Sequence, residues 1–327
     1  MFKLYKFELK KLHHSVTFWI CLIIFSLIVA AMGYINGALI NSVGDTIEWT
    51  QEQIAAAEKD MTESEKKQFE EQLEWQKNGG AIQHIQTEDS ETAKFAAENN
   101  INEECGIPGF VEQAFESTSI LAIVLSVIVS VMVSQEYSNS TIKLSLISGH
   151  RRDEIIGGKL LALFTAVIEF IFSAAILTLI ASIAYFLISK QANPEPWNCL
   201  KMVFLSGRLT ALPAWARLIM LALMAILEAF MFASFAFFIS ILTKNTPVTI
   251  ILPIVAALIP TFISSEKLTN NVVWRHLFFN LQGNYQLWSP YVTGSSALWT
   301  ALLTCAIWTV LFVGASFVIF EQRDVYN

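Results

Sequence analysis

The sequence predicts an all-α polytopic membrane protein with six transmembrane helices, and two observations lead to this fold class. Hydrophobic residues make up 54% of the 327 residues and charged residues 15%, whereas a soluble domain has about 25% charged residues. Six segments are apolar over about the 20 residues that a helix needs to cross the hydrocarbon layer. Lipid offers the backbone no hydrogen-bond partner, so these segments must be helical. They are Val16–Ile35, Ser117–Ser134, Leu160–Ile188, Leu218–Leu242, Pro247–Ser264 and Ala297–Phe320.

The composition also argues against other classes of protein. Four cysteines in 327 residues are too few for a secreted disulfide scaffold. A formal net charge of -7 argues against a nucleic-acid partner. The His residues show no metal-ligand spacing, so we expect no bound metal or cofactor.

Residues 1–36 are predicted to form an interfacial elbow helix followed by the first span. Apolar residues recur at helical spacing over three turns before the span, while lysines fall mainly on other sides. The span is too long for the core of a cleaved signal peptide, so we expect it to be retained. The alternative is a basic anchor that only fixes orientation. The apolar residues are Phe2, Tyr5, Leu9 and Leu12, and the lysines are Lys3, Lys6, Lys10 and Lys11.

Residues 37–116 are predicted to form an acidic helical insert outside the cell. This segment holds 18 acidic and 5 basic residues, whereas the rest of the chain is mildly basic. Such a difference in charge indicates that the two parts face different surroundings. Its apolar residues favour a long amphipathic helix over Ile47–Lys77 and a second helix near Glu88–Asn99. The insert is interpreted as an outer cap or gate, or as a solvated hairpin that only keeps the outer face folded. A disulfide between Cys105 and Cys199 is left open.

Residues 117–327 are predicted to contain the second to sixth spans. Pro194, Pro196 and Pro213 indicate a largely irregular connection between the third and fourth spans. Residues 265–296 are aromatic but interrupted by polar side chains, so we expect a re-entrant or interfacial segment there. With six spans, both termini lie on one side. Short loops on that side carry ten Lys and Arg against six on the other, which predicts cytoplasmic termini in the cell membrane.

Two carboxylates fall inside predicted spans, Glu169 in the third and Glu228 in the fourth. Charged groups in the membrane are costly and are associated with function. They could therefore line a translocation path. The alternative is a carboxyl group that bonds to Ser, Thr or Trp of a neighbouring helix.

The loop between the second and third spans, residues 135–159, carries the most specific pattern. An acidic-aromatic pair, Glu136-Tyr137, is followed by small polar residues, a Thr, a basic residue and a short helix ending at Ser148-Gly149. Basic residues and a Gly-Lys pair then lead into the third span. The positions are Ser138–Ser140, Thr141, Lys143, Leu144–Ile147, Arg151, Arg152 and Gly158-Lys159. This pattern resembles the signature region of ABC-2-type transporter permeases.

The resemblance implies a coupling helix at residues 138–150 that docks on a separate ATP-binding subunit. The residues implied in coupling are Glu136, Tyr137, Thr141, Lys143, Leu146, Arg151 and Arg152. It also implies two ATP-binding subunits and a second permease chain, identical or different. This chain has no phosphate-binding loop, because Gly157-Gly158-Lys159-Leu160 lacks the spacing and the hydroxyl. ATP and Mg²⁺ are therefore expected on the partner.

The implied function is that of a permease subunit, without enzyme activity of its own, in an ATP-driven exporter of peptides, lipids or drug-like molecules. Two alternatives remain at this point. One is an intramembrane enzyme that uses Glu169 or Glu228, and the other is a membrane sensor or anchor with the acidic loop as its sensing module. A soluble ATPase that co-purifies with the chain would distinguish the transporter from both.

Overall fold

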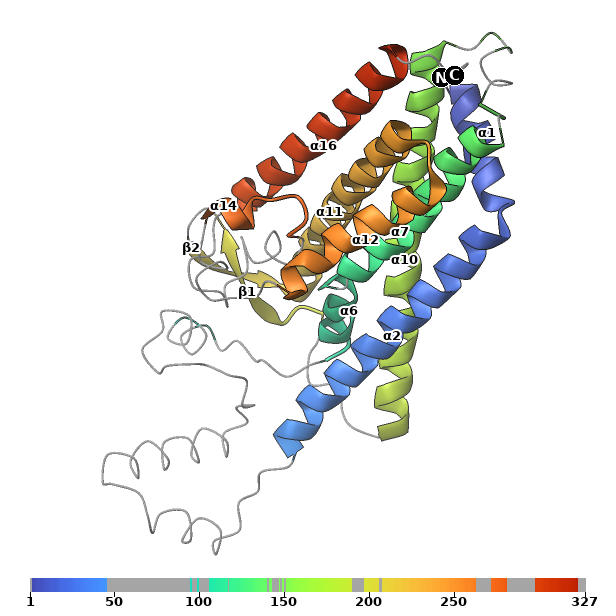
Figure 1. Ribbon diagram of the computed structural model, residues 1–327. Helices are drawn as coiled ribbons and strands as arrows, with labels where there is room; N and C mark the ends of the chain where they lie inside the picture. The colour runs from blue at the N-terminus through green and yellow to red at the C-terminus, as the bar shows by residue number, and fades with distance from the viewer. Residues whose placement is uncertain are drawn as a thin grey trace, which may run out of the picture.

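The computed structural model describes residues 2–45, 95, 99, 106–116, 118–139, 141–142, 147, 149, 151–189, 197–205, 208–262, 272–280 and 298–322. Within these residues the chain forms a bundle of long helices with one small hairpin (Figure 1). The helices are α1 (Phe2–His13), α2 (Val16–Asp45), α6 (Ile107–Glu116), α7 (Thr118–Val129), α8 (Gln135–Ser138), α10 (Arg152–Ser189), α11 (Ala214–Thr243), α12 (Thr246–Phe262), α14 (Val272–Arg275) and α16 (Leu298–Gln322).

The structure confirms a polytopic helical membrane protein. Five helices among the described residues are long and apolar enough to cross a membrane, and they correspond to the predicted first, second, third, fourth and sixth spans. The predicted fifth span forms α12, which is apolar but has 17 residues. At about 1.5 Å per residue, α12 is roughly 25 Å long. The count of six spans therefore stays a prediction.

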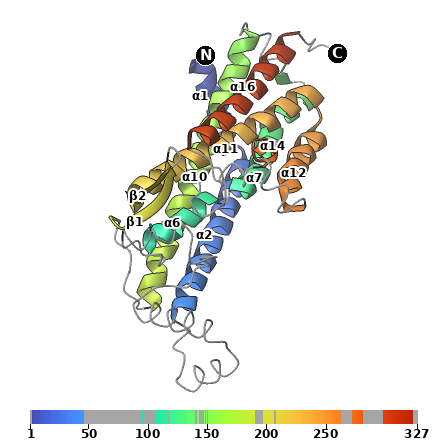
Figure 2. The same ribbon diagram turned by 90° about the vertical axis from the view of Figure 1, so that its left-hand side faces the viewer.

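Helix α11 lies at the centre of the bundle, and α7, α10, α12 and α16 pack around it. Its buried residues are largely Ala, Met and Phe. In contrast, α2 and α16 expose large aliphatic and aromatic side chains, which suits contact with lipid. Both views place α1, the beginning of α10 and the end of α16 at one end of the bundle (Figures 1 and 2). We call it the α1 end.

The second span contains a π-helix, η2 (Ser130–Ser134), between α7 and α8. Ser134 in η2 is fully buried, and its hydroxyl lies 2.7 Å from that of Ser240 in α11 and 2.8 Å from that of Thr249 in α12. A buried hydroxyl needs such partners, because an unpaired one is costly away from water. These contacts hold the second span against α11 and α12 near the α1 end.

The connection before α11 corrects one expectation. The connection between the third and fourth predicted spans, residues 189–217, was expected to be largely irregular, but Leu200–Leu205 (β1) and Arg208–Pro213 (β2) form an antiparallel hairpin. Pro213 pairs with Leu200 at the end of the hairpin. Proline has no N–H to donate to the partner strand, and at the end of a strand this loss disturbs the hydrogen-bond ladder least. It then becomes the N-cap of α11 with φ -63°. The proline thus marks the end of a strand.

A buried ion pair joins this hairpin to the bundle. Arg217 at the start of α11 lies 3.4 Å from Glu112 in α6, measured from Nε to Oε1. Its Nη1 donates to the carbonyl of Met202 in β1 at 3.2 Å. Residues 107–116, which were predicted as part of the acidic insert, therefore pack in the bundle as α6.

Most of the predicted acidic insert lies outside the described residues. This holds for the predicted helices Ile47–Lys77 and Glu88–Asn99, apart from Phe95 and Asn99, and for Cys105.

Part of the predicted interfacial segment, residues 272–280, packs on α16 through aromatic contacts. The ring of Phe278 lies 5.4 Å from that of Trp308 and 5.1 Å from that of Phe312. The indole of Trp308 also donates to the carbonyl of His276 at 2.8 Å. The remainder of residues 265–296 lies outside the described residues.

We expect Gly37→Ala to destabilise the fold, because the new Cβ would lie 2.5 Å from the ring of Phe110 in α6. Overpacking of this kind typically costs about 1–3 kcal/mol. Gly314→Ala is the matched control, since the methyl group that it adds meets no heavy atom within 4 Å. Thermal unfolding of the purified chain in detergent would measure both. If Gly37→Ala is as stable as Gly314→Ala, the close contact between Gly37 in α2 and Phe110 in α6 is wrong.

Candidate functional site

Helix α1 packs against the first half of α10, and Gly158 makes the approach possible. A Cβ at Gly158 would lie 3.3 Å from Cγ of Leu4 and 3.4 Å from the backbone nitrogen of Tyr5. Further along, the hydroxyl of Tyr5 lies 3.0 Å from that of Thr165. The two helices therefore run side by side in the same direction, and a large side chain at residue 158 would push them apart.

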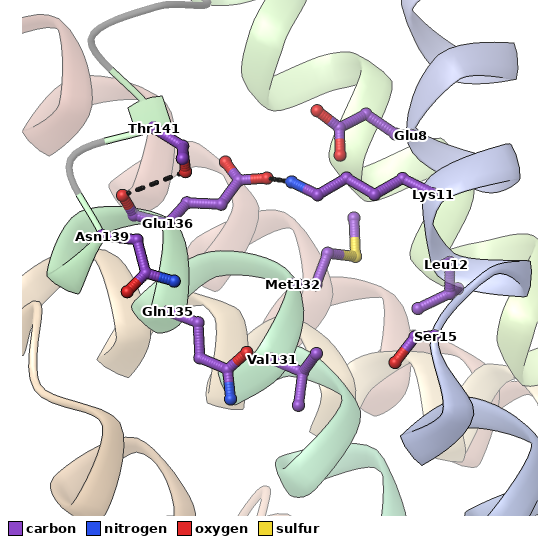
Figure 3. Close-up of a pocket in the computed structure, with 10 residues that line it drawn as sticks. All are labelled: Glu8, Lys11, Leu12, Ser15, Val131, Met132, Gln135, Glu136, Asn139 and Thr141. Atoms are coloured by element: carbon purple, nitrogen blue, oxygen red, sulfur yellow. Dashed lines mark hydrogen bonds and ion pairs between the residues drawn. The ribbon is translucent and has the colours of Figure 1, made fainter.

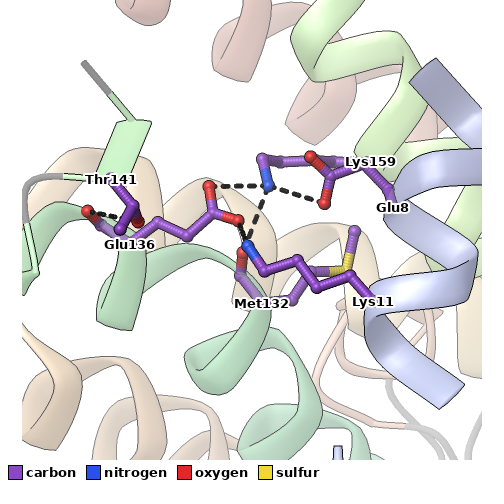
Figure 4. Close-up of polar contacts among 6 residues, drawn as sticks. All are labelled: Glu8, Lys11, Met132, Glu136, Thr141 and Lys159. Atoms are coloured by element: carbon purple, nitrogen blue, oxygen red, sulfur yellow. Dashed lines mark hydrogen bonds and ion pairs between the residues drawn. The ribbon is translucent and has the colours of Figure 1, made fainter. Parts of the chain in front are cut away.

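Four charged side chains meet where α1, the end of the second span and α10 come together (Figure 4). Lys159 in α10 places its Nζ 3.0 Å from Oε2 of Glu8 and 2.8 Å from Oε2 of Glu136. Lys11 in α1 pairs with the other carboxylate oxygen of Glu136. We call Glu8, Lys11, Glu136 and Lys159 the ion cluster.

The ion cluster is neutral in total and mostly shielded from solvent. Lys159, Glu8 and Glu136 are 2%, 3% and 5% exposed, whereas the side chain of Lys11 is 46% exposed. Taking these charges out of water costs free energy, which their mutual attraction offsets only while every charge keeps its partner. The cluster thus favours one arrangement of the three elements.

Lys159 also connects the ion cluster to the π-helix. Its Nζ donates to the backbone carbonyl of Met132, which lies in η2, at 3.3 Å. A π-helix shifts the regular i to i+4 pairing of carbonyls, and such segments often occur at functional sites. A single ammonium group therefore contacts α1, the π-helix and Glu136 in α8, two residues beyond the end of the π-helix.

The loop after α8 is anchored at both ends. At its start, the Thr141 hydroxyl donates to the carbonyl of Glu136 at 3.4 Å. At its end, Gly149 has φ +84°, a conformation that suits glycine. The carboxylate of Glu154 then accepts from the backbone N–H of Arg151 at 3.4 Å, as in half of a capping box.

A pocket of about 200 Å³ opens between α1 and the end of the second span, beside the ion cluster (Figure 3). Leu12, Val131 and Met132 give it apolar walls. Polar groups of Ser15, Gln135, Asn139 and Thr141 also line it. The pocket is open to solvent next to the loop for which the resemblance implies a coupling role.

The chain matches the model of the family described as "ABC-2 family transporter protein" over residues 2–325. The chain belongs to the ABC-2 transporter family. No curated protein and no solved structure gives a significant match.

The structure gives a physical role to both residues of the Gly-Lys pair in the ABC-2 pattern. Gly158 allows α1 to approach α10, and Lys159 reaches the two carboxylates. Glu136 lies in the same cluster, although the resemblance had assigned it to contact with a partner. Tyr137 is half-buried with Nζ of Lys244 5.5 Å from its ring centre, so it contacts the turn between α11 and α12.

The two arginines differ in their surroundings. The side chain of Arg151 is 80% exposed, which leaves it available to a partner. Arg152 instead donates through Nη1 to the carbonyls of Phe320 and Glu321 at 3.2 and 3.0 Å. A cation is favoured at a helix C-terminus, so Arg152 holds the end of α16 against the start of α10. Lys143 and Leu146 lie outside the described residues.

The two carboxylates predicted inside spans have different environments. Glu169 lies 2.9 Å from Nε2 of His13 at the end of α1, and both side chains are partly exposed. It therefore continues the contact between α1 and α10. Glu228 is buried in α11 close to Cys305 in α16. Their assignment to a translocation path stays a prediction.

Sequence reasoning missed Glu8 and Lys11 as site residues. The expected apolar face of the first helix was Phe2, Tyr5, Leu9 and Leu12, but Phe2 is 67% exposed. The buried residues are Leu4, Glu8 and Leu12, four apart. The sequence did offer one signal for a buried site residue, because Glu8 is a single carboxylate halfway between Leu4 and Leu12 on the same side of the helix. The Lys159 partner could not be deduced, because it lies 151 residues away.

We expect Lys159→Met to destabilise the protein by about 3–5 kcal/mol, because Glu8 loses its cation while remaining buried. Adding Glu8→Met should restore most of this loss, since Glu136 keeps Lys11. Lys11→Met is the control and should cost less than about 1 kcal/mol, because the side chain is half-exposed. Thermal unfolding in detergent would measure all four proteins. Equal stability of Lys159→Met and wild type would contradict the cluster.

Proposed function

We propose that this chain is the membrane-spanning permease subunit of an ATP-driven exporter, and that a separate ATP-binding subunit docks on the predicted coupling segment, residues 138–150. Membership of the ABC-2 family supports the transporter assignment. ATP and Mg²⁺ bind to the partner in this proposal. The loop is expected to transmit the closure of the ATP-binding subunits to the spans.

The observation that carries the proposal is the ion cluster at the base of this loop. Glu136 precedes the loop and Lys159 follows it, and their side chains pair at 2.8 Å. A displacement of the loop therefore moves the second and third spans together, because their ends are fixed to each other. Rigid-body motion of packed helices is a common way to carry a change between sites.

Two further contacts extend this motion to other spans. Glu8 and Lys11 attach α1, which leads directly into α2, to the same cluster. Arg152 attaches the end of α16. A push at the loop thus reaches the first, second, third and sixth predicted spans through contacts in one small region.

The same proposal sets the orientation and the assembly. The α1 end faces the cytoplasm, because ATP is found there, and the excess of Lys and Arg on that side supports this. The protein is placed in the cell membrane. A complete transporter is expected to contain two permease chains and two ATP-binding subunits, and its cargo is a peptide, a lipid or a drug-like molecule.

Co-purification tests the proposed function directly. The tagged chain, expressed in its native cell and extracted in mild detergent, should bring with it a soluble ATP-binding protein and ATPase activity. A chain that is purified alone in several mild detergents, without ATPase activity, would overturn the proposal.

We expect Arg151→Glu to weaken the ATP-binding subunit's docking at least about tenfold, equivalent to about 1.4 kcal/mol, because it reverses an exposed charge at the contact. Arg151→Lys is the matched control and should dock normally. Arg152→Glu should instead lower the permease's own stability, by roughly 2 kcal/mol, because α16 loses its cationic partner. Quantitative pull-down and thermal unfolding separate the two effects. Normal docking of Arg151→Glu would remove Arg151 from the interface.

A further inference from the structure

The turn between α11 and α12 has an unusual backbone. Helix α11 ends at Thr243 and α12 begins at Thr246, so two residues make the connection. The first of them, Lys244, is left-handed with φ 53°, and no other non-glycine residue that the structure describes has a positive φ. This conformation strains a lysine, and glycine or asparagine usually takes it after a helix. Strain of this kind persists where other contacts require it and often marks a functional position.

The side chain of Lys244 makes the contact that a glycine could not. Its Nζ lies 5.5 Å from the ring centre of Tyr137 at the end of the second span. An ammonium group within about 6 Å of an aromatic ring is attracted to the ring face. The backbone N–H of Lys244 donates to the carbonyl of Ser240 at 3.0 Å and closes the last turn of α11. A glycine would close α11 in the same way, so only the contact with Tyr137 needs the lysine.

Two buried serines of the second span hold the same turn. The hydroxyl of Ser130 donates to the carbonyl of Thr246, the first residue of α12, at 3.4 Å. The hydroxyl of Ser134 bonds to one hydroxyl in α11 and one in α12. Ser130, Ser134 and Tyr137 therefore contact the turn from one side of the second span.

The opposite side of the same segment contacts the ion cluster. Lys159 in α10 binds the carbonyl of Met132 and the carboxylate of Glu136. The end of the second span thus lies between two attachments, one to α10 and α1 and the other to the α11–α12 turn. A movement of this segment acts on both.

We propose that Lys244 is a positioning residue that transmits movement of the coupling segment to the fourth and fifth predicted spans. The proposal rests on the proposed function, because an ATP-binding subunit must move that segment. The ion cluster carries the movement to α1 and α10, and the contact between Tyr137 and Lys244 carries it to the α11–α12 turn. The connection has only two residues, so α11 and α12 follow together as packed helices. Residue 244 lies outside the coupling segment that the resemblance implies.

Two reporter cysteines test the proposal in the complete complex, each in a chain without its native cysteines. Val248→Cys lies in the first turn of α12 and Leu161→Cys in α10, where the native side chains are 37% and 41% exposed. The rate of labelling by N-ethylmaleimide is compared without nucleotide and with ATP plus vanadate. We expect both rates to change, because both helices follow the coupling segment. Lys244→Gly should lose the change at residue 248 and keep the change at residue 161.

Matched variants show whether the lost response comes from the contact itself. Lys244→Arg retains the cation and should keep the change at residue 248. Tyr137→Leu should lose this change, whereas Tyr137→Phe retains the ring and should keep it. Lys244→Gly should unfold within about 3 °C of the unsubstituted chain, because glycine fits the left-handed backbone. A lost response therefore does not come from a loss of folding.

The two reporters separate this proposal from the one on which it rests. If residue 161 shows no nucleotide-dependent change in the unsubstituted chain, the proposed function fails and this proposal fails with it. A change at residue 161 without one at residue 248 would show that the movement does not reach α12. A Lys244→Gly chain that keeps the full change at residue 248, or a Lys244→Arg chain that loses it, would overturn the role of Lys244.

Discussion

Lys159 brings a positive charge into a part of the bundle where only 2% of its surface reaches solvent. An isolated charge there would be prohibitively costly, so two carboxylates from different elements must come to it. Glu8 arrives on α1 and Glu136 on α8. The position of α1 against α10, the end of the second span and the start of the coupling loop all depend on this pairing. Gly158 permits the required closeness, because it adds no side chain between the helices.

A buried ion pair is present toward the other end of the bundle as well. There Arg217 and Glu112 join α11 to α6, and the same arginine bonds to the hairpin. Between the two, the contacts are mainly apolar, apart from small hydroxyl bonds such as that between Ser26 and Ser173 at 2.8 Å. Apolar packing alone lets helices slide at little cost in a membrane, since lipid is as apolar as the neighbouring helix. Paired charges near the two ends therefore set the register of the spans.

The spans could be predicted from the sequence because hydropathy over 20 residues is a strong signal, and α2, α10, α11 and α16 contain the predicted segments almost entirely. The hairpin could not, because strand pairing in a short loop depends on partners that local composition does not reveal. Glu136 and Lys159 were identified through the family pattern, but as parts of a loop and not as a pair. Glu8 belongs to the helix that was predicted to be interfacial, and it was not predicted as a site residue. Its partner lies 151 residues further along the chain, so only the fold brings the two charges together.

The ion cluster requires that α1, the end of the second span and the start of α10 move as one body. A disulfide between Leu4→Cys and Gly158→Cys, in a chain without its native cysteines, tests this most directly. Residue 4 lies against residue 158, and Leu4→Cys removes the Cγ atom that a new side chain there would meet. The measurement is the ATP hydrolysis rate of the complete complex in liposomes, oxidised and then reduced. We predict equal rates in both states, since the bond joins parts that do not separate. A rate that falls on oxidation and recovers on reduction would contradict the single moving body.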